Sequence, residues 1–267
     1  MIRLIALDLD QTLFGSDLIV SPRVRKAIAR AQSAGVLVTI ATGRETKLAT
    51  RFARELNITT PIICAQGGCI YDHVHDRFLH DVSLPARLLR PIMEAARQYG
   101  WNIHFETSNR LYLPRDSKHP PAFYELLRYS DWTCVDDLDR EMPELPHKLI
   151  VTLNQPEDRR RVLEEMQAAL GEEVTIVPSH PYLVEALPHG VNKGHGLAWL
   201  AKHLNLAQAE VLAIGDSDAD VPMLEWAGVG VAMGNGSPAA RAAADCIVPP
   251  LEEDGAASAI EQFALPS

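Results

Sequence analysis

The sequence predicts an α/β protein, in which a parallel-sheet core is interrupted by an inserted α+β segment. Short apolar runs alternate with segments of helical periodicity at both ends of the 267-residue chain, as in βαβ units. The middle of the chain alternates apolar and polar residues instead, which is typical of antiparallel strands. Apolar residues make up 47% of the chain and charged residues 22%, so a globular protein with a substantial core is expected.

The N-terminal part begins with LIAL (4–7), a continuous apolar run typical of a strand covered on both faces. Ser21 and Pro22 are favoured as the N-cap and first residue of a helix, and Gly35 is favoured at its end. The expected elements are a strand at 4–7, a helix from Ser21-Pro22 to Gly35, a strand at 36–41, a helix at 45–56 and a strand at 61–65. This order predicts right-handed crossovers and a parallel sheet.

The pattern changes near Val82, where the predicted insert begins. The expected elements are a helix at 85–99, antiparallel strands at 101–105 and 110–113, a helix at 120–130, a strand at 148–153, a helix at 156–170 and a hairpin of 173–177 with 182–187. We therefore predict an α+β cap domain over 82–188, inserted between the two parts of a core domain at 1–81 and 189–267.

The parallel rhythm returns after the insert. The expected elements are a helix at 194–204, a strand at 210–215, a helix near 220–227, a strand at 228–233 and a helix that begins at Ser237-Pro238. The helix at 194–204 carries its leucines at helical spacing, and Ser237-Pro238 repeats the start signal of the first helix.

Charge and composition exclude several classes of partner. The chain has 25 basic and 35 acidic residues, a net charge of −10, which disfavours binding to nucleic acid or to an anionic membrane surface. No apolar run approaches the roughly 18 residues of a transmembrane helix, and MIRLIALDLD does not resemble an export signal. The four cysteines are then expected to be reduced, and we expect a cytoplasmic protein.

Polar residues directly follow the predicted core strands. They are Asp8, Asp10 and Thr12, then Thr42, Gly43 and Arg44, then Gln66 to Gly68, and finally Asp216, Asp218 and Asp220. The carboxyl ends of parallel strands meet at one edge of the sheet, where ligands bind. Carboxylates crowded at such an edge repel one another unless a cation neutralises them, and Mg²⁺ is the natural partner.

Phosphate-binding groups are expected at the same edge. Thr42 has a hydroxyl donor, Gly43 offers a backbone N–H at the start of a helix, and Lys193 precedes a helix across the insert. An acidic metal site with phosphate donors indicates phosphoryl transfer.

Four motifs in order carry a resemblance to a known family. DLDQT (8–12), TGR (42–44), Lys193-Gly194 and GDSDAD (215–220) resemble the motifs of the haloacid dehalogenase superfamily of phosphohydrolases. The place of the insert, AMGNGSP (232–238) and YLVEALPHGVNKG (182–194) resemble its C2-capped, Cof-type branch. The resemblance implies a Mg²⁺-dependent phosphatase acting on a small phosphate ester, a sugar phosphate or nucleotide-like phosphate.

The resemblance also implies a role for each matching residue. Asp8 is expected to be the nucleophile and Asp10 the general acid and base. Asp8, the backbone carbonyl of Asp10 and Asp216 are expected to hold Mg²⁺. The resemblance implies that Thr42 and Lys193 bind phosphoryl oxygens, and we also expect Gly43 and Arg44 of the same motif to bind phosphate. Asp220 is expected either to support the metal ligands or to be a cap or surface residue.

The chain departs from the family pattern at three positions. Gln11 replaces the usual Gly, Gln66 the usual Asn of the third strand, and Ala219 the usual Asn of the last motif. Two alternatives therefore stay open: a phosphomutase on the same scaffold, and a non-catalytic sensor of phosphorylated metabolites. Cys64, Cys69, His73 and His75 form a possible zinc pattern, but its spacing is unusual and we expect no zinc there.

Overall fold

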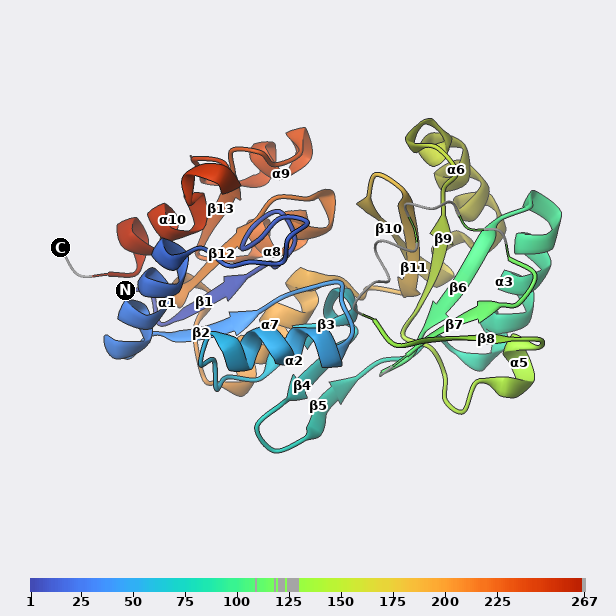
Figure 1. The fold of residues 1–267 in the computed structure, drawn as a ribbon, viewed down its shortest axis with the longest axis horizontal. Coiled ribbons are helices and arrows are strands. Elements are labelled where there is room, and N and C mark those ends of the chain that lie inside the picture. Colours follow the sequence, from blue (N-terminus) through green and yellow to red (C-terminus); the bar gives the residue numbers. More distant parts are fainter. Residues whose placement is uncertain (109, 118, 120–122, 124–129, 266–267) are drawn as a thin grey trace. The chain divides into compact units, whose positions relative to one another are not determined.

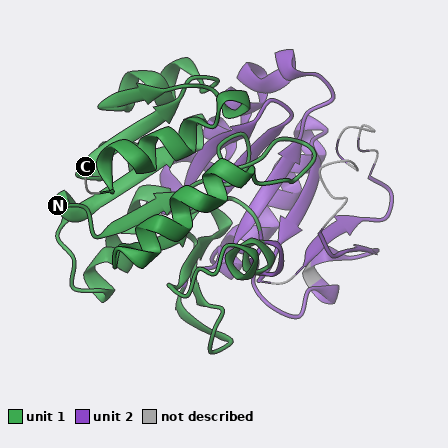
Figure 2. Ribbon diagram, turned by 60° about the vertical axis from the view of Figure 1, so that its left-hand side comes forward, with its two compact units in different colours: residues 1–44, 49–80, 192–267 green, residues 45–48, 81–191 purple. Residues whose placement is uncertain are grey.

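The computed structural model describes residues 1–108, 110–117, 119, 123 and 130–265. It divides into two compact units, shown in Figure 2: unit 1 comprises residues 1–44, 49–80 and 192–267, and unit 2 comprises residues 45–48 and 81–191. The predicted fold class is confirmed, since unit 1 contains a parallel sheet and unit 2 a second, mainly antiparallel sheet.

The central sheet of unit 1 has five parallel strands in the order β14-β13-β12-β1-β2 (Figure 1). The strands are β1 (Leu4–Leu7), β2 (Leu37–Ile40), β12 (Val211–Gly215), β13 (Val229–Met233) and β14 (Cys246–Val248). β1 lies between β2 and β12, so that the segments that follow these three strands emerge side by side at one edge.

The helices that belong wholly or mostly to unit 1 are α1 (Pro22–Ser33), α2 (Thr46–Glu55), α7 (Lys193–His203), α8 (Val221–Trp226), α9 (Pro238–Ala243) and α10 (Gly255–Phe263). The first turn of α2 is counted with unit 2. The start signals act as predicted, because Ser21 and Ser237 each accept a hydrogen bond from a backbone N–H of the first turn. Apolar side chains of α7 and α8 pack on the strand residues Leu4, Ala6 and Ala213.

The third predicted strand joins the parallel sheet only through a bridge between Ala41 and Ile63. This strand, β3 (Ile62–Cys64), continues through the 3₁₀ turn η1 (Ala65–Gly67) into an antiparallel ladder with β4 (Cys69–Asp72) and β5 (Arg77–Asp81). Neither β4 nor β5 was predicted from the sequence.

The sheet of unit 2 has six strands in the order β10-β11-β9-β6-β7-β8. They are β6 (Asn102–Glu106), β7 (Leu111–Pro114), β8 (Trp132–Val135), β9 (Lys148–Thr152), β10 (Val174–His180) and β11 (Leu183–Pro188). The predicted antiparallel pairs β6–β7 and β10–β11 are confirmed, whereas β8 was not predicted and pairs parallel to β7. The helix predicted at 120–130 lies largely outside the described residues.

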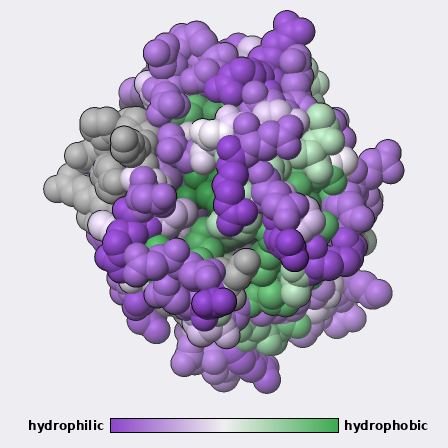
Figure 3. Space-filling model, turned by 90° about the vertical axis from the view of Figure 1, so that its right-hand side faces the viewer, coloured by the Kyte–Doolittle hydropathy of each residue, from purple (hydrophilic) through white to green (hydrophobic). Residues whose placement is uncertain are grey.

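The described helices of unit 2 are α3 (Ala86–Tyr99), α5 (Leu138–Glu141) and α6 (Arg159–Leu170). α3 and α6 cover one face of the sheet, where Ile92 and Met166 pack with Phe105, Leu149 and Val184. Figure 3 shows the side of unit 2 on which these helices lie, with polar side chains over much of the surface and apolar patches between them. None of the helices that the structure describes combines the length and apolar content needed to span a bilayer.

The turn η1 approaches the start of α7 so closely that only glycine fits at Gly67. Its φ is +95°, and an added Cβ would lie 2.1 Å from the carbonyl oxygen of Asn192. Asn192 in turn caps α7 by accepting a hydrogen bond from the His195 N–H at 2.8 Å. The contact between η1 and Asn192 therefore fixes the position from which Lys193 extends.

We predict that Gly67→Ala destabilises the protein more than Gly35→Ala does. Gly35 also has a positive φ, of +84°, but an added Cβ there meets nothing within 4 Å. The left-handed backbone should cost Gly35→Ala about 1 kcal/mol. The clash with Asn192 should cost Gly67→Ala about 1–3 kcal/mol more. Urea unfolding of both variants measures the difference, and equal losses would contradict this account of the turn.

Candidate active site

Asp8 and Asp216 lie together because they follow neighbouring parallel strands. Leu7 of β1 pairs with Ile214 of β12, and the Asp8 N–H donates to the Ile214 carbonyl at 3.0 Å. The Thr12 hydroxyl donates to Asp216 Oδ1 at 3.0 Å, which ties the loop after β1 to the loop after β12. The structure thus places the carboxylates of Asp8 and Asp216 together at this edge of the sheet.

Lys193, the first residue of α7, is the central cation of this edge. Its Nζ donates to Asp8 Oδ1 and to Asp220 Oδ1, at 2.6 Å in both cases. The lysine is only 2% exposed. Burial alone would lower the pKa of Lys193, but the carboxylates of Asp220 and Asp8 raise the pKa above its usual value. The ammonium is therefore charged at neutral pH and offsets part of the negative charge.

Asp220 is fully buried and uses both carboxylate oxygens to hold its surroundings. While Oδ1 accepts from Lys193, Oδ2 accepts from the backbone N–H groups of Asp216 and Ser217 and from the Ser217 hydroxyl, at 2.8–3.0 Å. Gly215 makes room for this arrangement, since an added Cβ would lie 2.6 Å from Asp220 Cβ. Asp220 thus positions both Lys193 and the backbone of Asp216.

The carboxylates of Asp8, Asp216 and Asp220 lie close enough to repel one another, so a bound cation would stabilise them. One oxygen from each of Asp8, Asp216 and Asp220 lies within 4.8 Å of the others, the one such group of possible metal ligands in the described part of the chain. Burial and the neighbouring Asp220 raise the pKa of Asp216 to about 7. Burial, followed by Asp220, also raises the pKa of Asp8 well above its usual value. Oxygen ligands with raised pKa values fit a hard divalent ion such as Mg²⁺.

Asp10 lies in the same loop as Asp8, but its carboxylate turns to Arg44. Asp10 Oδ2 accepts from Arg44 Nε at 2.7 Å and Oδ1 from Arg44 Nη2 at 2.6 Å, a two-pronged ion pair. The Asp10 side chain is 48% exposed, in contrast with the buried Asp8. Arg44, which was expected from the sequence to bind phosphate, is thus paired with Asp10, the residue expected to act as general acid and base.

Thr42 and Gly43 lie between β2 and the turn η1. Thr42 is fully buried, and its hydroxyl accepts a hydrogen bond from the Arg44 N–H at 3.2 Å. The Thr42 carbonyl accepts from the Gln66 N–H at 3.0 Å. An added Cβ at Gly43 would lie 2.4 Å from Gln66 Nε2, so the TGR segment and η1 pack closely together.

At two of the three departures the backbone explains the usual family residue, whereas nothing in the structure explains the glutamine that replaces it. Gln11 and Gln66 both have a φ of 58°, in the left-handed region. Glycine enters this region without strain and asparagine with little, whereas other residues pay about 1–2 kcal/mol. Ala219, the third departure, is buried in the turn between β12 and α8, next to Asp218, whose carboxylate accepts from the Ser237 hydroxyl.

Three residues of the site were not expected from the sequence: Asn192, Ser217 and Ser237. Each makes a short-range contact next to a predicted residue, Asn192 by capping the helix of Lys193 and Ser217 by donating to Asp220. The Ser237 N–H donates to the Asp216 carbonyl at 2.7 Å. Asn and Ser are typical N-cap residues. The positions of Asn192 before Lys193 and of Ser237 before Pro238 were therefore the sequence features from which these two contacts could have been predicted.

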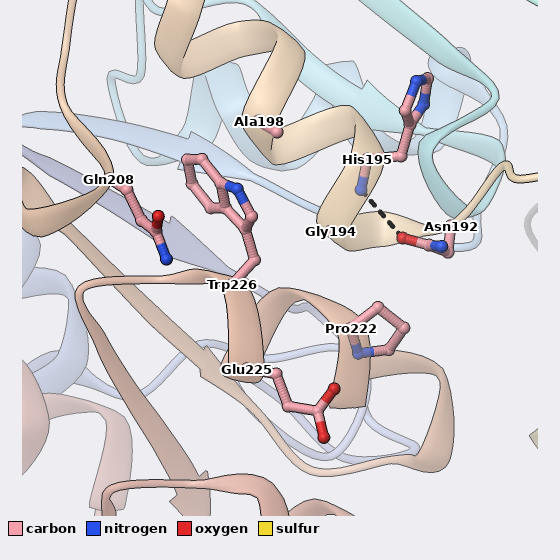
Figure 4. Close-up of a pocket in the computed structure, with 8 residues that line it drawn as sticks. All are labelled: Asn192, Gly194, His195, Ala198, Gln208, Pro222, Glu225 and Trp226. Carbon is pink, nitrogen blue, oxygen red and sulfur yellow. Dashed lines mark hydrogen bonds between the residues drawn. The ribbon is translucent and has the colours of Figure 1, made fainter.

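A pocket of about 410 Å³ lies beside the first turn of α7 (Figure 4). The cap residue Asn192 and His195 of α7 line one side of it, while Pro222 and Trp226 line it from α8. It contains none of the carboxylates of the site. The possible zinc residues lie elsewhere: Cys64 and Cys69 are opposite each other in the β3–β4 ladder, both buried.

The comparisons with known proteins agree with this geometry. The sequence profile of the haloacid dehalogenase-like hydrolases matches residues 5–260. The chain is 30% identical to the 5-amino-6-(5-phospho-D-ribitylamino)uracil phosphatase YcsE of Bacillus subtilis, over 99% of this chain and 96% of that protein. It is 27% identical to the HMP-PP phosphatase of Shigella flexneri, over 91% and 88% of the two chains. A haloacid dehalogenase-like hydrolase from Bacteroides thetaiotaomicron superposes with a TM-score of 0.85 at 28% identity, covering 98% of this chain and all of that one.

We predict that Mg²⁺ stabilises the protein much more at pH 8 than at pH 5. The pKa of Asp216 rises from its ordinary 3.8 to about 7 on folding without metal. The stability gained from this proton is present below pH 3.8 and is lost as the pH rises to about 7. Mg²⁺ takes the place of the proton at high pH but must displace it at low pH.

At pH 8 and about 100 times its dissociation constant, the ion should add roughly 2.7 kcal/mol to the free energy of unfolding. Thermal unfolding with and without Mg²⁺ at both pH values measures this, and Asp216→Asn, which lacks the titrating group, serves as the control. Equal stabilisation at the two pH values would rule out these carboxylates as the Mg²⁺ site.

Proposed function

The chain belongs to the haloacid dehalogenase-like hydrolases, and from this premise we propose that it is a Mg²⁺-dependent phosphatase of small phosphorylated metabolites that works through a phosphoryl-Asp8 intermediate. The observation that supports the proposal most strongly is the Lys193 ammonium held between Asp8 and Asp220, with Asp216 beside them. A nucleophilic carboxylate needs this kind of setting, which orients it and offsets the negative charge of an approaching phosphate.

In the first step, a carboxylate oxygen of Asp8 attacks phosphorus and the bond from phosphorus to the leaving oxygen breaks. Lys193 fixes Asp8 through Oδ1, which leaves Oδ2 as the attacking oxygen in our proposal. Asp10 donates a proton to the leaving oxygen. The incoming phosphoryl group competes for the Arg44 guanidinium and so releases Asp10 from its ion pair, which gives Arg44 the phosphate-binding role expected from the sequence.

In the second step, water attacks phosphorus and the bond to Asp8 breaks. Asp10, which the first step leaves ionised, removes a proton from this water, and it pairs with Arg44 again once the phosphate has left. Thr42 and the backbone of Gly43 lie beside Arg44 and are proposed to bind phosphoryl oxygens. Inorganic phosphate leaves, and Asp8 returns to its pair with Lys193.

The residues proposed to hold Mg²⁺ are Asp8, Asp216 and the backbone carbonyl of Asp10. The bound ion would neutralise the carboxylates and the phosphoryl oxygens. Asp220 is not proposed as a ligand, because its two oxygens already accept hydrogen bonds from Lys193, Asp216 and Ser217. It is proposed to support the ligands by fixing Lys193 and the loop that carries Asp216.

We propose that the insert, 82–188, is a cap that selects the leaving group. The relatives named above act on different small esters, and their names specify a phosphoribitylaminouracil in one case and HMP-PP in the other. A common site for phosphoryl transfer with a variable insert accounts for this range. A phosphate-release assay with Mg²⁺ across a panel of metabolite phosphates tests the function, separates a phosphatase from a phosphomutase, and would show no turnover for a sensor.

Asp8→Asn should abolish turnover and Asp10→Asn should slow the second step more than the first. The amide at position 8 keeps the shape but is a poor nucleophile, whereas removal of the base at position 10 leaves Asp8 able to accept a phosphoryl group. Acid-quenched reactions followed by mass spectrometry of the Asp8 peptide measure this. A normal rate of phosphate release from a folded Asp8→Asn variant would contradict the proposed mechanism.

Ala219→Asn should raise kcat/KM, through tighter binding of Mg²⁺ or of the substrate. The methyl group of Ala219 makes no hydrogen bond, while an amide aimed into the site adds one to a charged group, worth roughly 1.5–3 kcal/mol or about tenfold to more than a hundredfold. The gain is smaller if Asp218 or water already fills this role. Measurement of kcat/KM for one substrate across Mg²⁺ concentrations tests this prediction. An unchanged value in a folded Ala219→Asn variant would show that the site does not need a hydrogen bond from this position.

A further inference from the structure

The turn that follows β13 lies at the same edge of the sheet as Asp8 and Asp216, because β13 runs parallel to β12. It comprises Gly234 to Ser237, and none of its residues takes part in the proposed phosphoryl transfer. The Ser237 N–H donates to the Asp216 carbonyl at 2.7 Å, and an added Cβ at Gly236 would lie 3.0 Å from the same oxygen. The turn therefore packs against the backbone of a proposed Mg²⁺ ligand.

The side chain of Asn235 connects this turn with two other loops. Its Nδ2 donates to the Gln11 carbonyl at 2.9 Å, and its Oδ1 accepts from the Leu251 N–H, also at 2.9 Å. Gln11 lies between Asp10 and Thr12, whereas Leu251 belongs to the segment after β14. Asn235 is exposed, so its role is to join these loops rather than to fill the core.

Gln11 has a backbone conformation that needs support. Its φ of 58° lies in the left-handed region, which is unfavourable for any residue with a Cβ. Such a conformation persists only where the neighbouring structure fixes it. The Gln11 N–H donates to the Phe14 carbonyl at 2.8 Å, and the Phe14 ring stacks on Phe52 with the ring centroids 4.4 Å apart. Phe14 thus anchors the N–H side of Gln11, and Asn235 holds the carbonyl side.

The position of Asp10 depends on the backbone of Gln11. Thr12 is fixed separately, because its hydroxyl donates to Asp216. A Gln11 residue that relaxed to negative φ would therefore turn the peptide unit that joins it to Asp10. The Asp10 carboxylate must lie close to the leaving oxygen in order to protonate it, and a displacement of about 1 Å can slow a reaction about a hundredfold.

We propose that Asn235 is a positioning residue, which holds the left-handed Gln11 and so keeps Asp10 in place for proton transfer to the leaving oxygen. The inference rests on the proposed function, because it takes Asp10 as the general acid. In the alternative, purely structural role, Asn235 only ties the segment of Leu251 to the turn. The two roles use opposite ends of the amide, Nδ2 for Gln11 and Oδ1 for Leu251.

Asn235→Asp separates these roles, since a carboxylate keeps the acceptor for the Leu251 N–H and loses the donor to Gln11. The probes are glycerol 2-phosphate, whose alkoxide leaving group needs a proton, and p-nitrophenyl phosphate, whose leaving group needs none. We expect the variant to lower the ratio of kcat/KM for the first ester to kcat/KM for the second by roughly three- to tenfold. This quantity covers the steps up to loss of the leaving group, so hydrolysis of phosphoryl-Asp8 does not affect it.

Asn57→Asp is the matched control, because it adds the same charge at another exposed asparagine with a positive φ, of 52°. It should leave the ratio unchanged. An unchanged ratio in a folded Asn235→Asp variant would overturn the inference, since the bond to Leu251 would then be the one that matters. If Asn235→Asp does not fold, Asn235→Ala gives the same measurement, with the same expected fall and the same contradicting result.

A second background tests whether the conformation of Gln11 is the link. Glycine adopts a φ of 58° without strain, so Gln11→Gly should make the support from Asn235 less important. Asn235→Ala should lower the ratio roughly three- to tenfold in the wild-type background and at most about twofold in the Gln11→Gly background. Equal losses in the two backgrounds would overturn the inference.

Amide hydrogen exchange distinguishes a failure of the inference from a failure of the proposed function. We expect the loop 9–14 to exchange about three- to tenfold faster in Asn235→Asp than in Asn57→Asp, without any substrate. If the wild-type protein releases no phosphate from either ester but the loop exchanges faster, the proposed function falls and the support of Gln11 by Asn235 stands. Equal exchange in the two variants overturns the inference, whatever the activity.

Discussion

The buried ammonium of Lys193 is the interaction on which the rest of the site depends. It lies 2.6 Å from Asp8 and from Asp220, and Asp220 in turn holds the backbone of Asp216. Removal of one partner from a buried ion pair typically costs 3–5 kcal/mol, because the remaining charge is left without compensation. Two glycines make room for the residues next to this lysine. Gly67 lets the turn η1 approach Asn192 closely, and Gly215 leaves space for the Asp220 side chain.

Much of the fold could be predicted from local patterns. The strands of the parallel core and the capped helices carry strong signals, as LIAL and Ser21-Pro22 show. The missed elements are short or weakly patterned: β14 has three residues, and α10 begins with the small residues GAAS, which give little contrast between faces. β8 depends on pairing with β7, a contact between strands that are distant in sequence.

The candidate site could be predicted as a set of residues but not as a set of contacts. The rule that parallel strand ends share an edge was enough to gather Asp8 and Asp216, whereas Lys193 was expected there from its place before a helix. The pairing of Asp10 with Arg44 was not predictable, since a guanidinium can bind a phosphate or a carboxylate equally well. The ion pairs of Lys148 with Glu106 and Glu185 were not predicted, because these residues look like ordinary surface charges until the strand register brings them together.

Asp8 is proposed to accept a phosphoryl group in a site that Mg²⁺ would complete. A crystal structure of the protein with Mg²⁺ and beryllium fluoride, which mimics a phosphoryl group on a carboxylate, tests it most directly. We expect beryllium to be bonded to an Asp8 oxygen, with fluorine atoms in contact with Lys193 and Thr42 and with Mg²⁺ in contact with Asp8 and Asp216. Beryllium fluoride bound away from Asp8, or a Mg²⁺ ion held by other residues, would contradict it.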